Sequence, residues 1–411
     1  MFTSSKIKNI HAREILDSRG NPTLEVCVTI GAGTFCAGVP SGASTGQHEA
    51  VELRDGDMSR FSGKGVLRAV DNVNSIINPQ LAGMDAANQG AIDKKMREID
   101  ATPNKSRLGA NAICGVSLAC ARAAAAHKKI PLYDYIAKIS GAKIAMPKAC
   151  FNVINGGAHA GNDLDIQEFM IVPQGQNFSD NLQTAAQIYH QLKKDLSQKY
   201  GKSSANVGDE GGFAPAIDSA KTALECLAQA IVAVDSKIQT KFILDVAATQ
   251  FFNNEKYNMR AGSFDSNGLN QFYSQLISSF PQIIGLEDPF SEDDWLAWQN
   301  FSFSGIKIGD DLLVTNSFRV KEAQEKKACN AMILKINQIG TITEALEAAQ
   351  LAKDFGWKII VSHRSGETND DFIADFAVGI GAEFIKSGAP ARGERLAKYN
   401  RLAKIEEEMG V

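Results

Sequence analysis

The segment Phe242-Ile243-Leu244-Asp245 is a short apolar run that ends in a charged side chain, and five more apolar runs that end in a polar or charged residue follow it in the chain. In chain order they are Ile283-Ile284-Gly285-Leu286-Glu287, Ile306-Lys307-Ile308-Gly309-Asp310, Met332-Ile333-Leu334-Lys335, Ile359-Ile360-Val361-Ser362-His363 and Glu383-Phe384-Ile385-Lys386. Most of them are separated by about the length of one helix. Repeated strand-helix units predict a barrel whose parallel strands all open at one end. We therefore expect the six terminal side chains to meet there.

The first 140 residues have a different pattern, which predicts a separate domain of mixed α+β structure over 1–140 before a barrel over 141–411. A strand is expected at 26–30, and helices are expected at 64–82, 87–100 and 108–127. The loop Ser41-Gly42-Ala43-Ser44-Thr45-Gly46 consists of small and turn-forming residues, which predicts a mobile lid. Within the barrel, Thr341 as a cap, Glu344 three residues later and Gly356 at the end predict a helix over 341–356.

The composition excludes several classes of protein. The 411 residues are 44% hydrophobic and 22% charged, which is typical of a globular protein, and the net charge of -4 is not that of a non-specific nucleic-acid binder. No apolar run is long enough to predict a membrane span, and the first ten residues lack the apolar core of a secretory signal. The seven cysteines are dispersed, so we expect reduced thiols in the cytoplasm, with neither a disulfide framework nor a zinc site.

Three of the converging side chains are carboxylates on successive strands: Asp245, Glu287 and Asp310. Hard oxygen ligands that leave room for water or substrate favour Mg²⁺ over zinc. The alternative is a set of structural salt bridges with Lys307 or Lys335, which the spacing alone leaves open.

The other three strands supply positive charge and hydrogen-bond donors. Lys335 beside a bound cation would have its ammonium form disfavoured and would serve as a base. Donors cluster at His363, Arg364 and Ser365, which suits a phosphate or carboxylate, and Lys386 adds another cation. Each of these residues taken alone could equally be an ordinary ion-pair partner.

A second group of candidates lies in loops upstream. His159 is surrounded by glycines at 156–161, Gln167 and Glu168 end another apolar alternation, and Glu210 lies in Gly208-Asp209-Glu210-Gly211-Gly212. Glycine allows the backbone to approach a ligand closely. A single histidine or glutamate in a loop is more often only solvated, so this group is informative as a set.

At these residues the sequence resembles the enolase family over nearly its whole length. The matching segments are Asp17-Ser18-Arg19-Gly20-Asn21-Pro22-Thr23, SGASTG at 41–46, GGAHAGN at 156–162, VGDEGGFAP at 207–215, LEDPF at 286–290, LKINQIG at 334–340, SHRSGET at 362–368 and IKSGAPAR at 385–392. The resemblance implies an α/β fold with an N-terminal α+β domain and an atypical (β/α)8 barrel. It also implies a magnesium-dependent enzyme that reversibly dehydrates 2-phosphoglycerate to phosphoenolpyruvate in glycolysis and gluconeogenesis.

The family's functional residues transfer to matching positions of this sequence. The resemblance implies that Asp245, Glu287 and Asp310 hold one Mg²⁺ and that Ser44 closes over a second Mg²⁺, which is bound with the substrate. It implies that Lys335 removes the proton from C2 and that Glu210, with Glu168 beside it, protonates the departing hydroxyl. The positions expected to contact substrate are His159, Gln167, Glu168, Glu287, Asp310, His363, Arg364, Ser365 and Lys386.

Two other functions stay open at this point: another dehydratase of sugar acids on the same type of barrel, or a non-catalytic surface-binding protein on this scaffold. Equal activity on unphosphorylated acids would favour the first, because Arg364 and Ser365 predict dependence on phosphate. The resemblance further implies a homodimer or an octamer of dimers. We expect a cytoplasmic protein, with a secondary presence at the cell surface left open.

Overall fold

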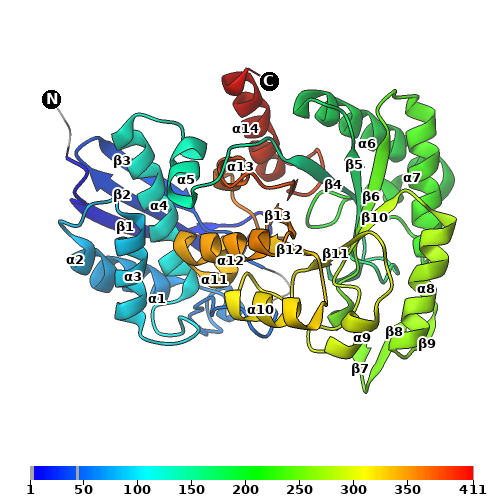
Figure 1. The fold of residues 1–411 in the computed structure, drawn as a ribbon, viewed down its shortest axis with the longest axis horizontal. Coiled ribbons are helices and arrows are strands. Elements are labelled where there is room, and N and C mark those ends of the chain that lie inside the picture. The colour runs from blue at the N-terminus through cyan, green and yellow to red at the C-terminus, as the bar shows by residue number, and fades with distance from the viewer. Residues whose placement is uncertain (1–3, 43–45, 411) are drawn as a thin grey trace.

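The N-terminal part of the molecule is a three-stranded antiparallel sheet with helices packed against it (Figure 1). The computed structural model describes residues 4–42 and 46–410. The strands are β1 (Asn9–Leu16), β2 (Pro22–Ile30) and β3 (Gly33–Gly38). In β2, Leu24, Val26 and Val28 are fully buried and alternate with partly exposed residues, which is the period expected when one face of a sheet covers the core. The predicted strand at 26–30 is confirmed as part of β2.

The helices of this part end just before the barrel begins. They are α1 (Leu67–Asp71), the π-helical η2 (Asn72–Ile77), α2 (Asn78–Leu81), α3 (Gln89–Asp100), α4 (Ala110–Lys128) and α5 (Leu132–Ser140), with a short η1 at Phe61–Gly63. The helix expected at 64–82 is thus divided by a π-helical segment, in which Asn74 bonds the backbone of Ala12 on β1. Helix α4 is buried along almost its entire length and packs against β2 and β3.

Eight strands close into the predicted barrel, in the order β10-β11-β12-β13-β14-β4-β5-β6. Their bounds are β4 (Lys148–Asn155), β5 (Glu168–Pro173), β6 (Thr240–Asp245), β10 (Ile283–Glu287), β11 (Ile306–Gly309), β12 (Ala331–Leu334), β13 (Lys358–Ser362) and β14 (Phe384–Lys386). Strand β5 runs antiparallel to both of its neighbours, and the remaining pairs are parallel. The atypical barrel is confirmed, and its reversed strand brings the start of β5 to the end where the other strands finish.

Helices surround the barrel (Figure 1). They are α6 (Phe178–Tyr200), α7 (Ala220–Val234), α8 (Ser266–Ser279), α9 (Trp295–Asn300), α10 (Ser317–Lys326), α11 (Ile336–Ile339), α12 (Ile342–Asp354), α13 (Phe372–Gly379) and α14 (Gly393–Met409). Short 3-10 turns lie at η3 (Gly157–His159), η4 (Lys202–Ala205) and η5 (Ala248–Phe251). A small separate sheet consists of β7 (Phe252–Asn253), β8 (Lys256–Met259) and β9 (Gly262–Phe264). The predicted capping of α12 is confirmed: Thr341 accepts a hydrogen bond from the Glu344 amide, and Gly356 has a positive φ of 76°. No helix of the described residues has the length and apolar character needed to cross a membrane.

The expectation of cysteines without disulfides is wrong at one pair. Cys27 of β2 and Cys36 of β3 form a disulfide. The antiparallel register places these residues directly opposite each other, with 4.0 Å between their Cα atoms. Spacing along the sequence hides this relation, because only the hairpin turn brings the two cysteines together. Five further cysteines are buried and free.

Polar contacts join the N-terminal part to the barrel beside the loop at 41–46. Ser41 exchanges two backbone hydrogen bonds with Gly366, which follows strand β13. Farther away, Asp93 of α3 accepts hydrogen bonds from the backbone amide and the hydroxyl of Thr343 on α12. Ser44, the predicted second metal ligand, lies outside the described residues. The N-terminal part is therefore joined to the barrel at two separate places.

Candidate active site

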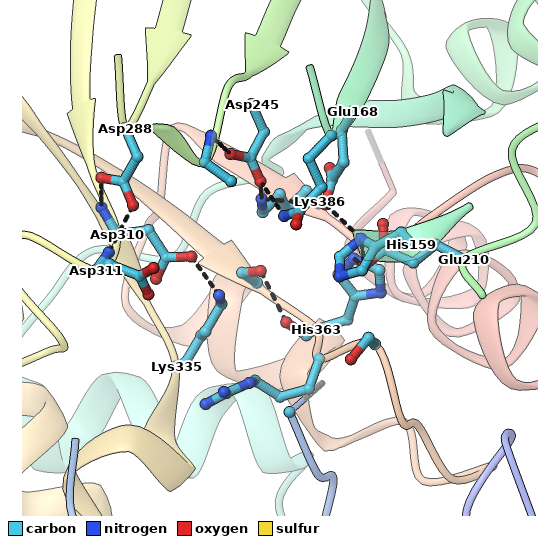
Figure 2. Close-up of a pocket in the computed structure, with 16 residues that line it drawn as sticks. His159, Glu168, Glu210, Asp245, Asp288, Asp310, Asp311, Lys335, His363 and Lys386 are labelled. Atoms are coloured by element: carbon cyan, nitrogen blue, oxygen red, sulfur yellow. Dashed lines mark hydrogen bonds and ion pairs between the residues drawn. The ribbon is translucent and has the colours of Figure 1, made fainter. Parts of the chain in front are cut away.

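Nearly all of the predicted site residues surround one small cavity of about 30 Å³ at the barrel mouth (Figure 2). The predicted residues lining it are His159, Gln167, Glu168, Glu210, Asp245, Asp310, Lys335, His363, Arg364, Ser365 and Lys386. Glu287 lies just behind this lining, where its Oε1 accepts a hydrogen bond from the Lys386 ammonium. Strand ends of the barrel supply most of these side chains, and the Gly-rich loops supply His159 and Glu210.

Lys386 lies among three carboxylates. Its Nζ is 2.6 Å from Glu287, 3.2 Å from Asp245 and 3.5 Å from Glu168. All four side chains are buried. Asp245 and Glu287 therefore meet at an ammonium group in this structure, and burial of an ammonium is tolerated because these carboxylates surround it.

Lys335 forms a second buried ion pair, with Asp310. Although burial opposes the charge, Asp310 raises the pKa of the Lys335 ammonium. Burial also opposes the ionised form of Asp310, but Lys335 and Lys386 lower the pKa of this carboxyl to about 2. Asp310 thus favours the protonated form of Lys335. For Lys335 to act as a base, Asp310 would first have to pair with another cation.

The acids behind Lys386 fit a metal ion. The Oε2 atoms of Glu287 and Glu168 are buried and have no hydrogen-bond partner among the described residues. Burial and the neighbouring Asp245 raise the pKa of Glu287 well above its ordinary value. A buried carboxylate with an unused oxygen gains most from a bound cation. The oxygen donors and their environment therefore suit a hard divalent ion.

Asp288 and Asp311 were missed by the sequence reasoning. The two oxygens of Asp288 accept hydrogen bonds from the amides of Asp310 and Asp311, at 2.9 and 2.7 Å. One oxygen from each of these three residues lies within 4.8 Å of the others. Burial and the adjacent Asp310 raise the pKa of Asp311 to about 8. Two doublets, Glu287-Asp288 and Asp310-Asp311, were the available signal, since each second acid directly follows a predicted ligand.

Two glutamates and two histidines form the opposite side of the cavity. The His159 Nδ1 and the His363 Nε2 both lie 3.4 Å from Oε1 of Glu210, and His159 Nδ1 is 4.0 Å from Glu168. Burial and the charge of Glu210 raise the pKa of Glu168 well above its usual range. Burial acts the same way on Glu210, but His159 and His363 outweigh it and lower its pKa. These two directions favour the proton on Glu168, although the resemblance implies Glu210 as the proton donor.

Arg395 of α14 determines the protonation of His363. The fully buried guanidinium donates to His363 Nδ1 and to the Arg364 carbonyl, both at 2.8 Å, and also to the Asp209 and Ser365 carbonyls. Arginine has no acceptor atom, so Nδ1 carries no proton and the hydrogen is on Nε2, facing Glu210. Burial also lowers the pKa of His363, so the ring is neutral and stabilises Glu210 by donation rather than by charge. Sequence reasoning did not identify this arginine.

Arg364 connects the site to the N-terminal part of the chain. Glu49 accepts hydrogen bonds from both terminal nitrogens of the Arg364 guanidinium, at 2.8 and 3.1 Å. Both side chains are buried or nearly so. Burial opposes the charge, but Glu49 raises the pKa of Arg364 further. The two residues are far apart in sequence, and no local pattern around Glu49 indicates the contact.

The arrangement is that of a lyase on a barrel. Figure 2 shows Lys335 on one side of the cavity and the Glu168, Glu210 and His159 cluster on the other. Groups placed this way can take a proton from one carbon while an acid assists a leaving group on the next.

Similarity to known proteins defines the family. The chain belongs to the enolase family: the family model "Enolase, N-terminal domain" matches residues 7–136, and "Enolase, C-terminal TIM barrel domain" matches residues 143–411. Enolase 1 of Entamoeba histolytica is 51% identical, with 98% of this chain and 96% of the relative covered. An enolase of Mastigamoeba balamuthi is 52% identical (99% and 96% covered), and Enolase B of Dictyostelium discoideum is 54% identical (98% and 95% covered). The enzyme class is therefore that of enolase, a lyase of glycolysis.

Proposed function

We propose that the chain catalyses the reversible, magnesium-dependent dehydration of 2-phosphoglycerate to phosphoenolpyruvate through the residues of this cavity. The observation that supports this most directly is the placement of Lys335 and the Glu168–Glu210 pair on opposite sides of one buried cavity. In the forward direction a proton leaves C2, and hydroxide leaves C3 as water once it is protonated. Two groups facing a substrate from opposite sides are suited to these two steps.

We propose two Mg²⁺ ions per site, with Asp245, Glu287 and Asp310 holding the first and Ser44 closing over the second, which binds with the substrate. The unpartnered oxygen of Glu287 supports the first assignment. Bound Mg²⁺ would neutralise the extra negative charge that develops on the substrate carboxylate as the C2 proton leaves. To hold the ion, Asp245 and Glu287 would exchange part of their contact with Lys386 for contact with it.

Lys335 is the base in this proposal. Its present partner Asp310 keeps it protonated. A cation held by Asp310 would take that support from the ammonium and add a positive charge beside it, and both changes would lower the pKa of Lys335. The Lys335 amine could then accept the C2 proton. Lys386, held by Glu287, stays protonated and contacts the substrate carboxylate.

The glutamate pair is the acid. One proton is shared by Glu168 and Glu210, because two carboxylates this close in a buried site do not ionise together. Asn152 donates to Glu210 at 2.9 Å and the neutral His363 faces it, so Glu210 is held in place and its ionised form is favoured. We propose that the proton moves within the pair and that Glu210 delivers it to the departing hydroxyl.

The substrate phosphate is assigned to Arg364 and Ser365, and the remaining predicted contacts are His159, Gln167, Glu168, Glu287, Asp310, His363 and Lys386. An absorbance assay of phosphoenolpyruvate formation from 2-phosphoglycerate and Mg²⁺ tests the function. We expect turnover that stops when the metal is chelated. Equal turnover of unphosphorylated sugar acids would favour the dehydratase alternative, and folded protein without any turnover would favour a non-catalytic binding role.

The remaining expectations stay proposals of the same kind. We propose a division of the chain near residue 140, a cytoplasmic location, and assembly as a homodimer or an octamer of dimers, as the family resemblance implies. Sedimentation velocity distinguishes a monomer from these two assemblies. Cell fractionation tests the location, and recovery in the membrane-surface fraction would instead support the secondary presence at the cell surface.

A further inference from the structure

The outer face of the N-terminal sheet carries a group of metal-ligand side chains far from the barrel mouth. Cys27 and Cys36 face each other across β2 and β3, and Glu25 precedes Cys27 by two residues and so shares its face. One ligand atom from each of the three lies within 4.8 Å of the others. Cys27 Sγ is 3.9 Å from Glu25 Oε2. Two sulfurs and a carboxylate oxygen are thus already together.

A fourth donor lies on the neighbouring strand. His11 of β1 pairs with Cys27 in the antiparallel register, and its side chain is exposed. A hydrogen-bonded antiparallel pair has Cα atoms about 5.5 Å apart and directs both side chains to the same face. His11, Cys27 and Cys36 therefore form one row across three strands, with Glu25 in the adjacent row.

We propose that Cys27, Cys36, Glu25 and His11 form a redox-gated binding site for a thiophilic divalent cation of the Zn²⁺ class. In the disulfide form the two sulfurs are bonded to each other and supply no thiolate for a metal ion. In the reduced form two thiolates, an imidazole and a carboxylate supply four donors, each of a kind that tetrahedral Zn²⁺ binds. Because Mg²⁺ prefers oxygen ligands, this site is chemically distinct from the acids at the barrel mouth.

The geometry allows the change with small movements. Tetrahedral coordination with Zn–S bonds of about 2.3 Å places two sulfurs roughly 3.7 Å apart. The Cα atoms of Cys27 and Cys36 are 4.0 Å apart, so rotation about the Cα–Cβ bonds of these two residues can open their sulfurs to this spacing. Both cysteines are half-buried, unlike the five buried cysteines of the described residues. They are therefore the accessible redox pair.

One cation competes for the carboxylate. Arg13 of β1, opposite Glu25 in the register, forms an ion pair with it at 2.7 Å. Arg13 is two-thirds exposed, so this pair is weak and breaks easily when the ion binds. Removal of Arg13 is expected to tighten metal binding, because Glu25 then has no competing cation in this pair. If the four side chains were close together only by chance, the same change would leave metal binding as it was.

The opening step is an ordinary reduction. A water-soluble phosphine gives two electrons to the disulfide and takes an oxygen atom from water, whose two hydrogens protonate the two sulfurs. Binding of the cation then displaces both thiol protons to solvent. The full-length protein, oxidised or phosphine-reduced and freed of excess phosphine, is titrated with Co²⁺ alone, because thiolate-bound tetrahedral Co²⁺ absorbs strongly and oxygen-bound Co²⁺ does not.

We expect the thiolate-to-cobalt absorption in the reduced protein, its absence in the oxidised protein, and its loss in Cys27→Ser and Cys36→Ser. His11→Gln and Glu25→Gln weaken the titration, Arg13→Gln tightens it, and the buried control Cys329→Ser leaves it unchanged. Circular dichroism verifies that each variant is folded. The proposal is overturned if reduced protein gives no such band, or if the band persists in both folded cysteine variants. The readout is independent of turnover, so it stands apart from the proposed catalytic function.

Discussion

Replacing Glu49 by glutamine tests whether a residue of the N-terminal part balances the charge of Arg364, the proposed phosphate contact. The side chain of Glu49 holds Arg364 by two hydrogen bonds at 2.8 and 3.1 Å, and only 8% of Glu49 and 3% of Arg364 are exposed. Glu49→Gln keeps the shape and one acceptor oxygen but removes the negative charge. The buried guanidinium of Arg364 then loses the negative charge of Glu49.

The expected cost follows from the burial of the pair. Breaking a buried ion pair from one side costs about 3 to 5 kcal/mol. Glutamine still accepts one hydrogen bond, which favours the lower end, so we expect a loss of about 3 kcal/mol in the free energy of unfolding. A phosphate group beside Arg364 would replace the missing charge, so ligand should stabilise the variant more than the parent protein.

The assay is thermal unfolding with and without inorganic phosphate, and Glu98→Gln is the matched control because Glu98 is about half-exposed on α3. We expect Glu49→Gln to melt below the parent protein, the phosphate-induced rise to be larger in this variant, and Glu98→Gln to behave as the parent does. If Glu49→Gln is as stable as the parent, or phosphate raises both melting points equally, then Arg364 does not depend on Glu49 in the way the structure indicates.

The remaining predictions concern the barrel mouth and the contact between α3 and α12. Lys335→Ala should abolish both turnover and exchange of the C2 proton with solvent, measured by NMR in heavy water, and retained exchange would contradict its role as the base. Glu210→Gln should spare that exchange and block elimination; joint loss of the two would refute its role as the acid. Arg395→Lys should weaken the preference of His363 for the tautomer with hydrogen on Nε2, which changes the ¹⁵N chemical shifts of the ring. It should also lower the rate of elimination more than the rate of C2 exchange. An equal fall in both rates would show a merely structural role. Burial raises the pKa of Asp93 to about 6 from 3.8, so the folded state binds this proton more tightly than the unfolded state does. The contribution of Asp93 to the free energy of unfolding should therefore fall by roughly 3 kcal/mol as the pH rises from about 4 to about 6, and stay level above that. A ¹³C NMR titration of this carboxyl with its midpoint near 4 would contradict the prediction.

Much of the barrel could be predicted because its signals are local. Each of the six apolar runs is short and ends at a polar residue, and a parallel barrel brings all such ends together. The structure places Asp245, Asp310 and Lys386 around one cavity accordingly. The reversed direction of β5 follows no local pattern, and here it was the family resemblance that indicated an atypical barrel.

The rest depends on contacts between distant parts of the chain. Arg395 was missed because it lies in the amphipathic α14, where an arginine ordinarily faces solvent, yet it is fully buried between two loops of the site. The disulfide was missed because Cys27 and Cys36 become partners only through the register of the β2–β3 hairpin. Asp288 could have been found, since it directly follows Glu287, but its function of fixing the amide of Asp310 requires coordinates.

The charged side chains of the site pair with one another in a way that favours exchange of partners over simple addition of ligands. Five carboxyl groups, those of Glu168, Glu210, Asp245, Glu287 and Asp310, surround the two ammonium groups of Lys335 and Lys386. Even with one proton on Glu168, this set has an excess of negative charge in a buried space, which favours entry of divalent cations. A carboxylate that held such a cation would give up part of its contact with a lysine. The charge freed in this way is what a substrate bearing a carboxylate and a phosphate requires, so metal and substrate binding are expected to reinforce each other.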